Sequence, residues 1–171
     1  GGRVDSFVMR LTDVFLSIPS LVLAILVSTA LGPSLFNTMM AIAITWWPRY
    51  ARLVRSLTLS IRERAYIEAA RMVGSNTMRI VFRHILPNCI SPLTVAASLD
   101  MGATILVAAG LGFLGLGARP PTPEWGLMIS QARGYTPRWW WYATFPGLAI
   151  VTMVLGFNLL GDALRDILDP R

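Results

Sequence analysis

The side chains best suited to catalysis or metal binding are few in this sequence. His84 is the single histidine and Cys89 the single cysteine, and they stand five residues apart. A protein zinc site needs three or four ligands, so this pair alone cannot hold the metal. Glu68 has no second carboxylate at a spacing useful for acid–base catalysis. We expect no catalytic residue, no metal site and no cofactor, and we expect His84 to make a structural contact.

A glycine-rich stretch at 110–117 reads GLGFLGLG. A phosphate-binding loop would end in Lys followed by Ser or Thr, and this stretch does not. The stretch also lies inside a long apolar block, where small residues let helices pack closely. We interpret it as a packing surface, so the chain is not predicted to hydrolyse ATP.

The composition indicates a membrane protein. The chain is 54% hydrophobic and 14% charged, whereas soluble domains carry about 25% charged residues. Uncharged blocks cover 14–48, 101–118 and 139–161. They lack the polar face, repeating every three or four residues, that a helix in a soluble protein presents. We predict an all-α, polytopic transmembrane helix bundle that forms a single domain over 1–171.

A membrane span needs roughly 20 apolar residues, so the first block is long enough for two spans. Gly32-Pro33 supplies a break between helices at about 11–31 and 35–54. Pro19 is expected in the first turns of the first helix and Pro48 at a kink in the second. Two further blocks at about 90–117 and 139–161 bring the prediction to about four spans.

The arginines set the orientation by the positive-inside rule. If 1–10 is cytoplasmic, four spans place the loop 55–89 and the C-terminal segment 162–171 in the cytoplasm as well. The outer segment 118–142 then holds three arginines and the cytoplasmic side twelve. The twelve are Arg3, Arg10, Arg49, Arg52, Arg55, Arg62, Arg64, Arg71, Arg79, Arg83, Arg165 and Arg171. The net charge of +6 therefore indicates membrane topology, not nucleic-acid binding. In the outer segment, residues 124–133 are predicted to form a short helix lying flat on the surface.

Asp100 is the one carboxylate inside a predicted span. It lies about 10 Å from the inner end of that span. Such a residue either belongs to a gate or pathway, or pairs with an arginine at the inner face. Asn158 either lines a pathway or joins spanning helices by hydrogen bonding. The terminal charges, which include Asp162 and Asp169, either form a solvated helix end or contact a partner subunit.

The basic loop has its own local signals. The stretch RERAYIEAA at 62–70 predicts a helix, and Gly74 falls where a left-handed C-terminal cap is expected. Ser75 or Asn76 can cap a second short helix, TMRIVFRHIL, which Pro87 is expected to close. This pair of helices either binds lipid headgroups or docks into another protein. The small residues Ala69, Ala70 and Gly74 favour docking, because they allow a partner surface to approach closely.

The same loop resembles a known motif. Glu68-Ala69-Ala70, then three residues, Gly74, nine residues and His84-Ile85-Leu86-Pro87 match the spacing of the EAA loop of permease subunits in ATP-binding cassette importers. His84 stands where the general pattern has Ile. The stretches GGRVD, LGFLGLGARPPTPEWG and FNLLGDALRDILDPR extend the resemblance over nearly the whole chain, to the second permease subunit of the oligopeptide/dipeptide/nickel subfamily. One departure is Ala108-Ala109-Gly110-Leu111-Gly112, where that subfamily commonly has an acidic residue and a Ser ahead of FLGLG.

The resemblance implies a binding-protein-dependent permease in the cytoplasmic membrane. Its partners would be a second, similar permease, two ATPase subunits and an extracytoplasmic solute-binding protein. The loop would contain the coupling helix that sits in a groove of the ATPase. Glu68 would fix the loop by bonding neighbouring arginines, and Gly74 would allow its turn. The coupling residues would be Glu68, Ala69, Ala70, Gly74, His84, Leu86 and Pro87.

The solute implied is a short peptide, nickel or another small solute. Family members usually have about six spans, so a chain that starts Gly1-Gly2 is expected to lack the first two. Two other classes stay open. A membrane-embedded enzyme would need clustered ionisable residues at one depth, and a stand-alone transporter or channel would leave the basic loop unexplained.

Overall fold

The computed structural model describes residues 2–135 and 137–168. Every regular element in this part of the chain is helical, which confirms the predicted all-α class. Asp169 and Arg171, which figured in the predicted cytoplasmic end, lie outside the described residues. The elements are α1 (Arg3–Leu16), α2 (Ser20–Leu31), α3 (Leu35–Arg62), α4 (Ala65–Met72), α5 (Thr77–Ile80), the π-helical turn η1 (Val81–Ile85), α6 (Leu86–Phe113), α7 (Trp125–Ala132) and α8 (Trp141–Leu168).

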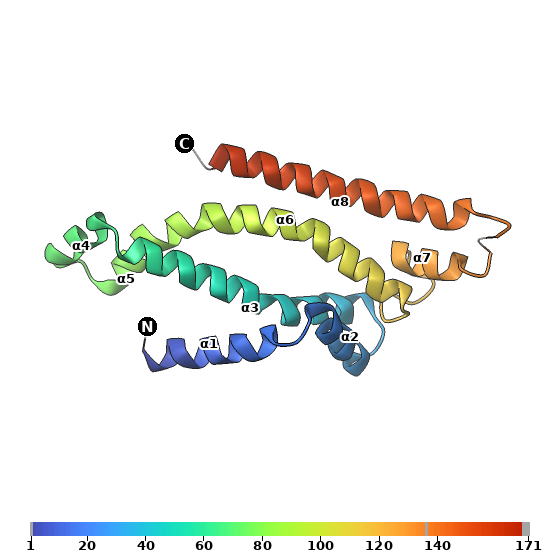
Figure 1. The fold of residues 1–171 in the computed structure, drawn as a ribbon, viewed down its shortest axis with the longest axis horizontal. Coiled ribbons are helices and arrows are strands. Elements are labelled where there is room, and N and C mark those ends of the chain that lie inside the picture. The colour runs from blue at the N-terminus through green and yellow to red at the C-terminus, as the bar shows by residue number, and fades with distance from the viewer. Residues whose placement is uncertain (1, 136, 169–171) are drawn as a thin grey trace.

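The long helices lie side by side along the molecule (Figure 1). The helix α6 packs against α8 on one side and α3 on the other, and α1 packs against α3. The short helices α4 and α5 lie at one end, together with the first turn of α1 and the last turn of α8 (Figure 1). The described segments that were predicted to be cytoplasmic therefore lie toward the same end of the bundle.

Two continuous helices in the described part are long and apolar enough to cross a membrane, Thr77–Phe113 and Trp141–Leu168. A third crossing is counted if α1 and α2, which are bent by 90° at their junction, form one span. The helix α3 does not pass this test, because arginines from Arg49 onward lower its hydropathy. The measure thus supports two or three of the four predicted spans, and the predicted span 35–54 is not among them.

The prediction of one helix over 11–31 is wrong. The helix begins earlier, at Arg3, and ends at Leu16, and α2 starts only at Ser20. Because α1 begins at Arg3, Pro19 would fall in a helix interior, not in its first turns. There it lacks an N–H donor and its ring would clash with a carbonyl of the preceding turn. The chain breaks at this point, and Pro19 becomes the N-cap of α2.

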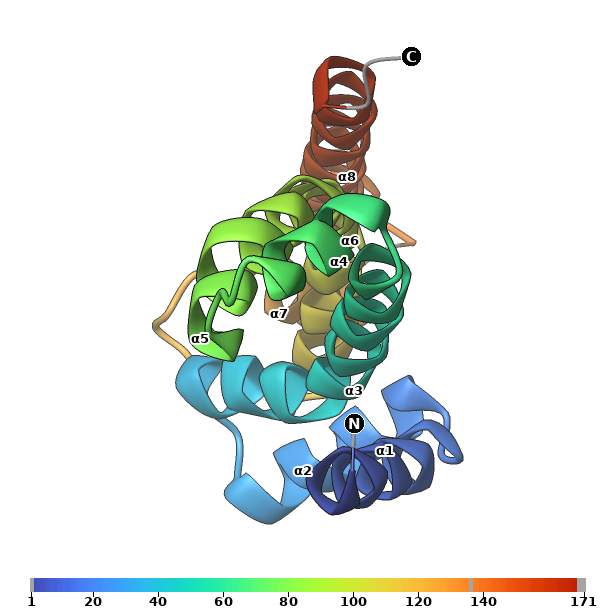
Figure 2. The same ribbon diagram turned by 90° about the vertical axis from the view of Figure 1, so that its left-hand side faces the viewer.

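Pro48 lies inside α3, which continues to Arg62. Figure 2 shows the first part of α3 crossing the view while its later part runs toward the viewer. A proline in a helix interior bends it for the same steric reason. The predicted bend of this helix is therefore present.

The prediction that Pro87 closes a short helix is also wrong. The helix that starts at Thr77 continues through η1 into α6 and ends at Phe113. The wider π-helical turn over Val81–Ile85 immediately precedes Leu86-Pro87. A π turn relieves the clash and the missing hydrogen bond that proline brings to a regular helix. The basic loop therefore leads directly into a membrane-spanning helix.

The outer helix predicted at 124–133 is present as α7, but it does not lie flat on the surface. It packs against both α6 and α8. Gly126 permits this, because a Cβ at its position would stand 2.7 Å from the carbonyl carbon of Ala109. At Gly112 a Cβ would likewise meet the carboxyl group of Glu124. Within the glycine-rich stretch 110–117, the predicted close packing is found at Gly112 and Gly117, whereas a Cβ at Gly110 or Gly115 would meet nothing within 4 Å.

Candidate functional site

The helix α4 ends in a glycine-dependent cap. Gly74 has a φ of 76°, the left-handed conformation that the sequence predicts for it. Its N–H donates to the carbonyl oxygen of Arg71 at 2.9 Å, and the N–H of Ser75 donates to that of Ala70 at 3.0 Å. This is the Schellman arrangement, which satisfies the last carbonyls of a helix. The chain reverses here and leads into α5.

Asn76 starts the next helix. Its side-chain oxygen accepts a hydrogen bond from the N–H of Met78 at 3.3 Å. Asn76, one of the two predicted cap residues, therefore takes this role. With Gly74 it sets the turn between α4 and the long helix that begins at Thr77.

A small apolar cluster holds this turn in place. Ile67 of α4 is fully buried and packs with Ile61, Ile80, Ile85 and Cys89. These side chains come from the end of α3, from α4 and from the first turns of the long helix. The cluster joins α4 to both long helices. Cys89, 1% exposed, is part of this packing.

The predicted loop residues lie on or next to α4, η1 and the first turn of α6, the elements that contribute Ile67, Ile85 and Cys89 to the cluster. Ala70 and His84 are partly buried, and the His84 ring lies 6.2 Å from the ring of Tyr66, the structural contact expected of it. The Glu68 side chain is exposed, and within the described ranges its carboxylate has no arginine partner. The expected bond from Glu68 to a neighbouring arginine is thus not made among the residues that the structure describes. The exposed members of the set are Glu68, Ala69, Gly74, Leu86 and Pro87.

The structure adds a feature that sequence reasoning missed. Met72 and Val73 are each 84% exposed, and Met78 and Phe82 are 63% and 60% exposed. We call these four side chains the apolar tip. Met72 ends α4 and Val73 follows it, while Met78 lies in α5 and Phe82 in η1, so Arg71 and Arg79 are their neighbours along the chain. The helices α4 and α5 lie at one end of the molecule (Figure 1). The sequence did contain a sign of this exposed surface. Met72 and Val73 before Gly74, and Met78 after it, are large apolar residues that do not recur at the three- or four-residue spacing of a buried helix face.

Asp100 is held by two donors from α3. The guanidinium Nη1 of Arg49 donates to its Oδ1 at 2.9 Å, and the hydroxyl of Tyr50 donates to its Oδ2 at 2.9 Å. Asp100 itself is 8% exposed. This is the arginine pair that the sequence left open as one alternative. The sequence did not identify Tyr50 as the second partner.

Asn158, the other predicted pathway residue, lies elsewhere. It is half-buried on α8, and its Oδ1 would stand 3.1 Å from a Cβ at Gly102. Asp100 faces α3, whereas Gly102 faces α8. The structure therefore does not bring Asp100 and Asn158 together.

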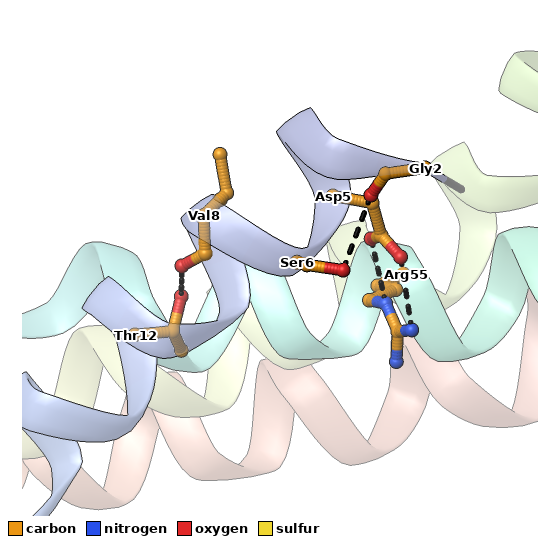
Figure 3. A network of polar contacts seen from close by, with 6 residues as sticks. All are labelled: Gly2, Asp5, Ser6, Val8, Thr12 and Arg55. Atoms are coloured by element: carbon orange, nitrogen blue, oxygen red, sulfur yellow. Dashed lines mark hydrogen bonds and ion pairs between the residues drawn. The ribbon is translucent and has the colours of Figure 1, made fainter.

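Two exposed ion pairs tie α1 to α3. The carboxylate of Asp5 receives two hydrogen bonds from Arg55, at 2.7 and 3.0 Å (Figure 3). Asp13 receives one from Arg52 at 2.7 Å. Arg49, Arg52 and Arg55 thus connect α3 to its neighbours on both sides.

Comparison with known proteins places this arrangement in a family. The chain is 52% identical over 171 residues to a probable D,D-dipeptide transport system permease protein of Escherichia coli K12. It is 50% identical over 169 residues to a di/tripeptide transport system permease protein of Pseudomonas aeruginosa. The first alignment covers 100% of this chain and 57% of the Escherichia coli protein, and the second covers 99% of this chain and 56% of the Pseudomonas aeruginosa protein. The chain therefore spans little more than half the length of these relatives. The family model of the binding-protein-dependent transport system inner membrane components matches the whole of this chain, residues 1–171, and the chain belongs to that family.

Proposed function

We propose that this chain is the membrane-spanning part of a permease subunit that imports short peptides, driven by ATPase subunits that dock at α4. The family assignment supports transport across the inner membrane. Relatives named for dipeptide and di/tripeptide transport support a peptide solute. The other partners would be a second permease and an extracytoplasmic solute-binding protein.

The apolar tip is the observation that carries the docking step. Met72 and Val73 project from a segment that is otherwise basic and polar, with Arg71 beside them. Exposed apolar side chains ringed by polar ones are typical of a protein interface. A protein groove would cover the tip and pair with the arginines and with the exposed Glu68.

The packing behind the tip supports a coupling role. The cluster around Ile67 connects α4 to the end of α3 and to the start of the helix Thr77–Phe113. That helix has 37 residues, so it is about 55 Å long. A push on α4 would therefore tilt a membrane-spanning element instead of deforming a loop. Discrete elements of this kind are what transmit a change between distant sites.

The topology follows from the same proposal. The α4 end of the bundle, with the first turn of α1 and the last turn of α8, would be cytoplasmic (Figure 1). Most of the arginines lie toward this end, as the positive-inside rule requires. The segment with α7 and residues 138–142 would then face the outside, where the solute-binding protein delivers its peptide.

Cross-linking in the assembled transporter tests the docking step. A Val73→Cys variant carrying a short cross-linker should capture an ATPase subunit. Leu106→Cys is the matched control, since Leu106 is also exposed, at 59%, but lies in the spanning part of α6. It should capture no ATPase. Capture of phospholipid alone from Val73→Cys would mean that the tip rests on the membrane surface, and would overturn the proposal.

A further inference from the structure

Arg49 is an exposed cation on α3, the helix that packs against the candidate span Thr77–Phe113. Its partner Asp100 lies 13 positions before the end of α6 at Phe113, which is about 20 Å along the helix. The hydrocarbon layer is about 30 Å thick, so the pair lies within it if Phe113 marks the outer edge of that layer. The Arg49 side chain is nevertheless 68% exposed, while that of Asp100 is 11% exposed.

An exposed guanidinium at this depth is costly if it faces lipid. Charged side chains within spans almost always face the protein interior or a water-filled cavity. The face of α3 that bears Arg49 would therefore point to the protein interior or to a water-filled space, and not to acyl chains. In the proposed permease, which works beside a second one, that space would be the solute pathway.

The hydrogen bonds decide which group the site can take. Both carboxylate oxygens of Asp100 are engaged, one by Arg49 and one by Tyr50. A second cation, such as a peptide ammonium group, would have to displace these donors. The guanidinium has five N–H groups in a planar fork, and one nitrogen, Nη1, bonds Asp100. Its remaining donors match a carboxylate, which binds a guanidinium in bidentate geometry.

We propose that Arg49, held in place by Asp100 and Tyr50, contacts the C-terminal carboxylate of the peptide during its passage. This inference rests on the proposed function, because it assigns a contact to the same transported solute. Arg49 acts as a specificity residue, and Asp100 and Tyr50 act as positioning residues that orient its side chain.

The test uses the complete transporter with its ATPase and binding-protein partners, in membrane vesicles. Uptake of a dipeptide is compared with uptake of the same dipeptide amidated at its C-terminus. The ratio of the two uptakes in a variant is divided by the ratio in the native assembly, so that selection by the binding protein cancels. Arg49→Gln should lower the ratio at least about tenfold, because the charge-assisted pair is lost. Arg49→Lys should lower it less, since the charge stays while the fork is lost.

Arg52→Gln is the matched control. Arg52 stands one turn further along α3, is 58% exposed and pairs with Asp13 on α1. Its loss should leave the ratio unchanged. If Arg49→Gln lowers both uptakes equally, or if Arg52→Gln shifts the ratio as much, the inference fails. A native assembly that imports no dipeptide would overturn the proposed function and this inference with it.

Labelling covers the case in which Arg49→Gln does not assemble. An Arg49→Cys variant should react with a negatively charged, membrane-impermeant thiol reagent, and saturating dipeptide should slow the reaction. The native Cys89 is buried and gives little background. An Arg49→Cys thiol that stays unreactive with and without ATP would show that position 49 faces no aqueous pathway, and would overturn the inference.

Discussion

Gly126 of α7 lies against the backbone carbonyl group of Ala109 on α6. A Cβ at position 126 would stand 2.7 Å from the carbonyl carbon and 2.8 Å from the Cα of Ala109. Real Cβ atoms essentially never approach backbone atoms so closely. This contact lets α7 fold back along α6 and α8 instead of lying on the surface.

We predict that Gly126→Ala separates α7 from α6. Backbone atoms cannot move aside as a flexible side chain can, so the free energy of unfolding should fall by about 1–3 kcal/mol. The measurement is thermal unfolding in detergent. Gly110→Ala, on α6, is the control, because a Cβ there meets nothing within 4 Å. Equal midpoints for the two variants would contradict the prediction.

Glu124 is expected to stabilise α7 from its N-terminus. Its carboxylate accepts hydrogen bonds from the N–H groups of Gly126 at 2.8 Å and Leu127 at 2.7 Å. Glu124→Ala removes this cap and should lower stability by about 1 kcal/mol. Glu124→Asp keeps an acceptor and should restore most of it. Hydrogen exchange at the two capped amides reports the effect, and unchanged exchange in Glu124→Ala would count against a capping role.

Gly74 is expected to be sensitive to substitution although it has open space around it. A Cβ at this position meets nothing within 4 Å, but its φ of 76° disfavours side chains. Gly74→Val should cost at least about 1–2 kcal/mol in backbone strain and misplace α4. Gly74→Asn, which tolerates this conformation, should be milder. Solute-stimulated ATP hydrolysis and uptake are the readouts, and full activity of Gly74→Val would contradict the coupling proposal.

Ile67 and Met72 on α4 should give opposite results. Ile67 is fully buried, so Ile67→Ala should lower stability by about 2–5 kcal/mol and expose the loop to limited proteolysis. Met72 is 84% exposed, so Met72→Ala should leave the stability of the chain unchanged. It should instead weaken binding of the ATPase subunits, measured by co-purification. Unweakened binding with Met72→Ala would remove Met72 from the proposed interface.

In the loop, neighbouring residues were enough to predict the structural features that extend over only a few residues. Gly74 predicted the left-handed cap, and Asn76 was one of two residues predicted to start the next helix. Caps act through hydrogen bonds within one turn, so their meaning can be read from neighbouring residues. The coupling roles of Glu68 and Pro87 came from the resemblance and stay predictions.

Pro19 and Pro87 show where prediction from neighbouring residues failed. The effect of Pro19 depends on where the preceding helix begins, and the effect of Pro87 on whether a π turn precedes it. Both segments pack against α3: Ile80 and Ile85 of the continuous helix are buried with Ile61, and α1 lies against α3. Proline is a strong local signal whose outcome the surrounding structure decides.

The sequence by itself determined the all-helical membrane class, the apolar blocks and the basic segment with its motif, because composition, hydrophobic runs and caps act over short distances. Only the tertiary structure decided that Asp100 pairs with Arg49 and Tyr50, some 50 positions earlier, and that Met72 and Val73 stay uncovered. Which polar group meets which, and which apolar side chain stays exposed, depends on how distant helices pack. That packing has no signature in any single segment.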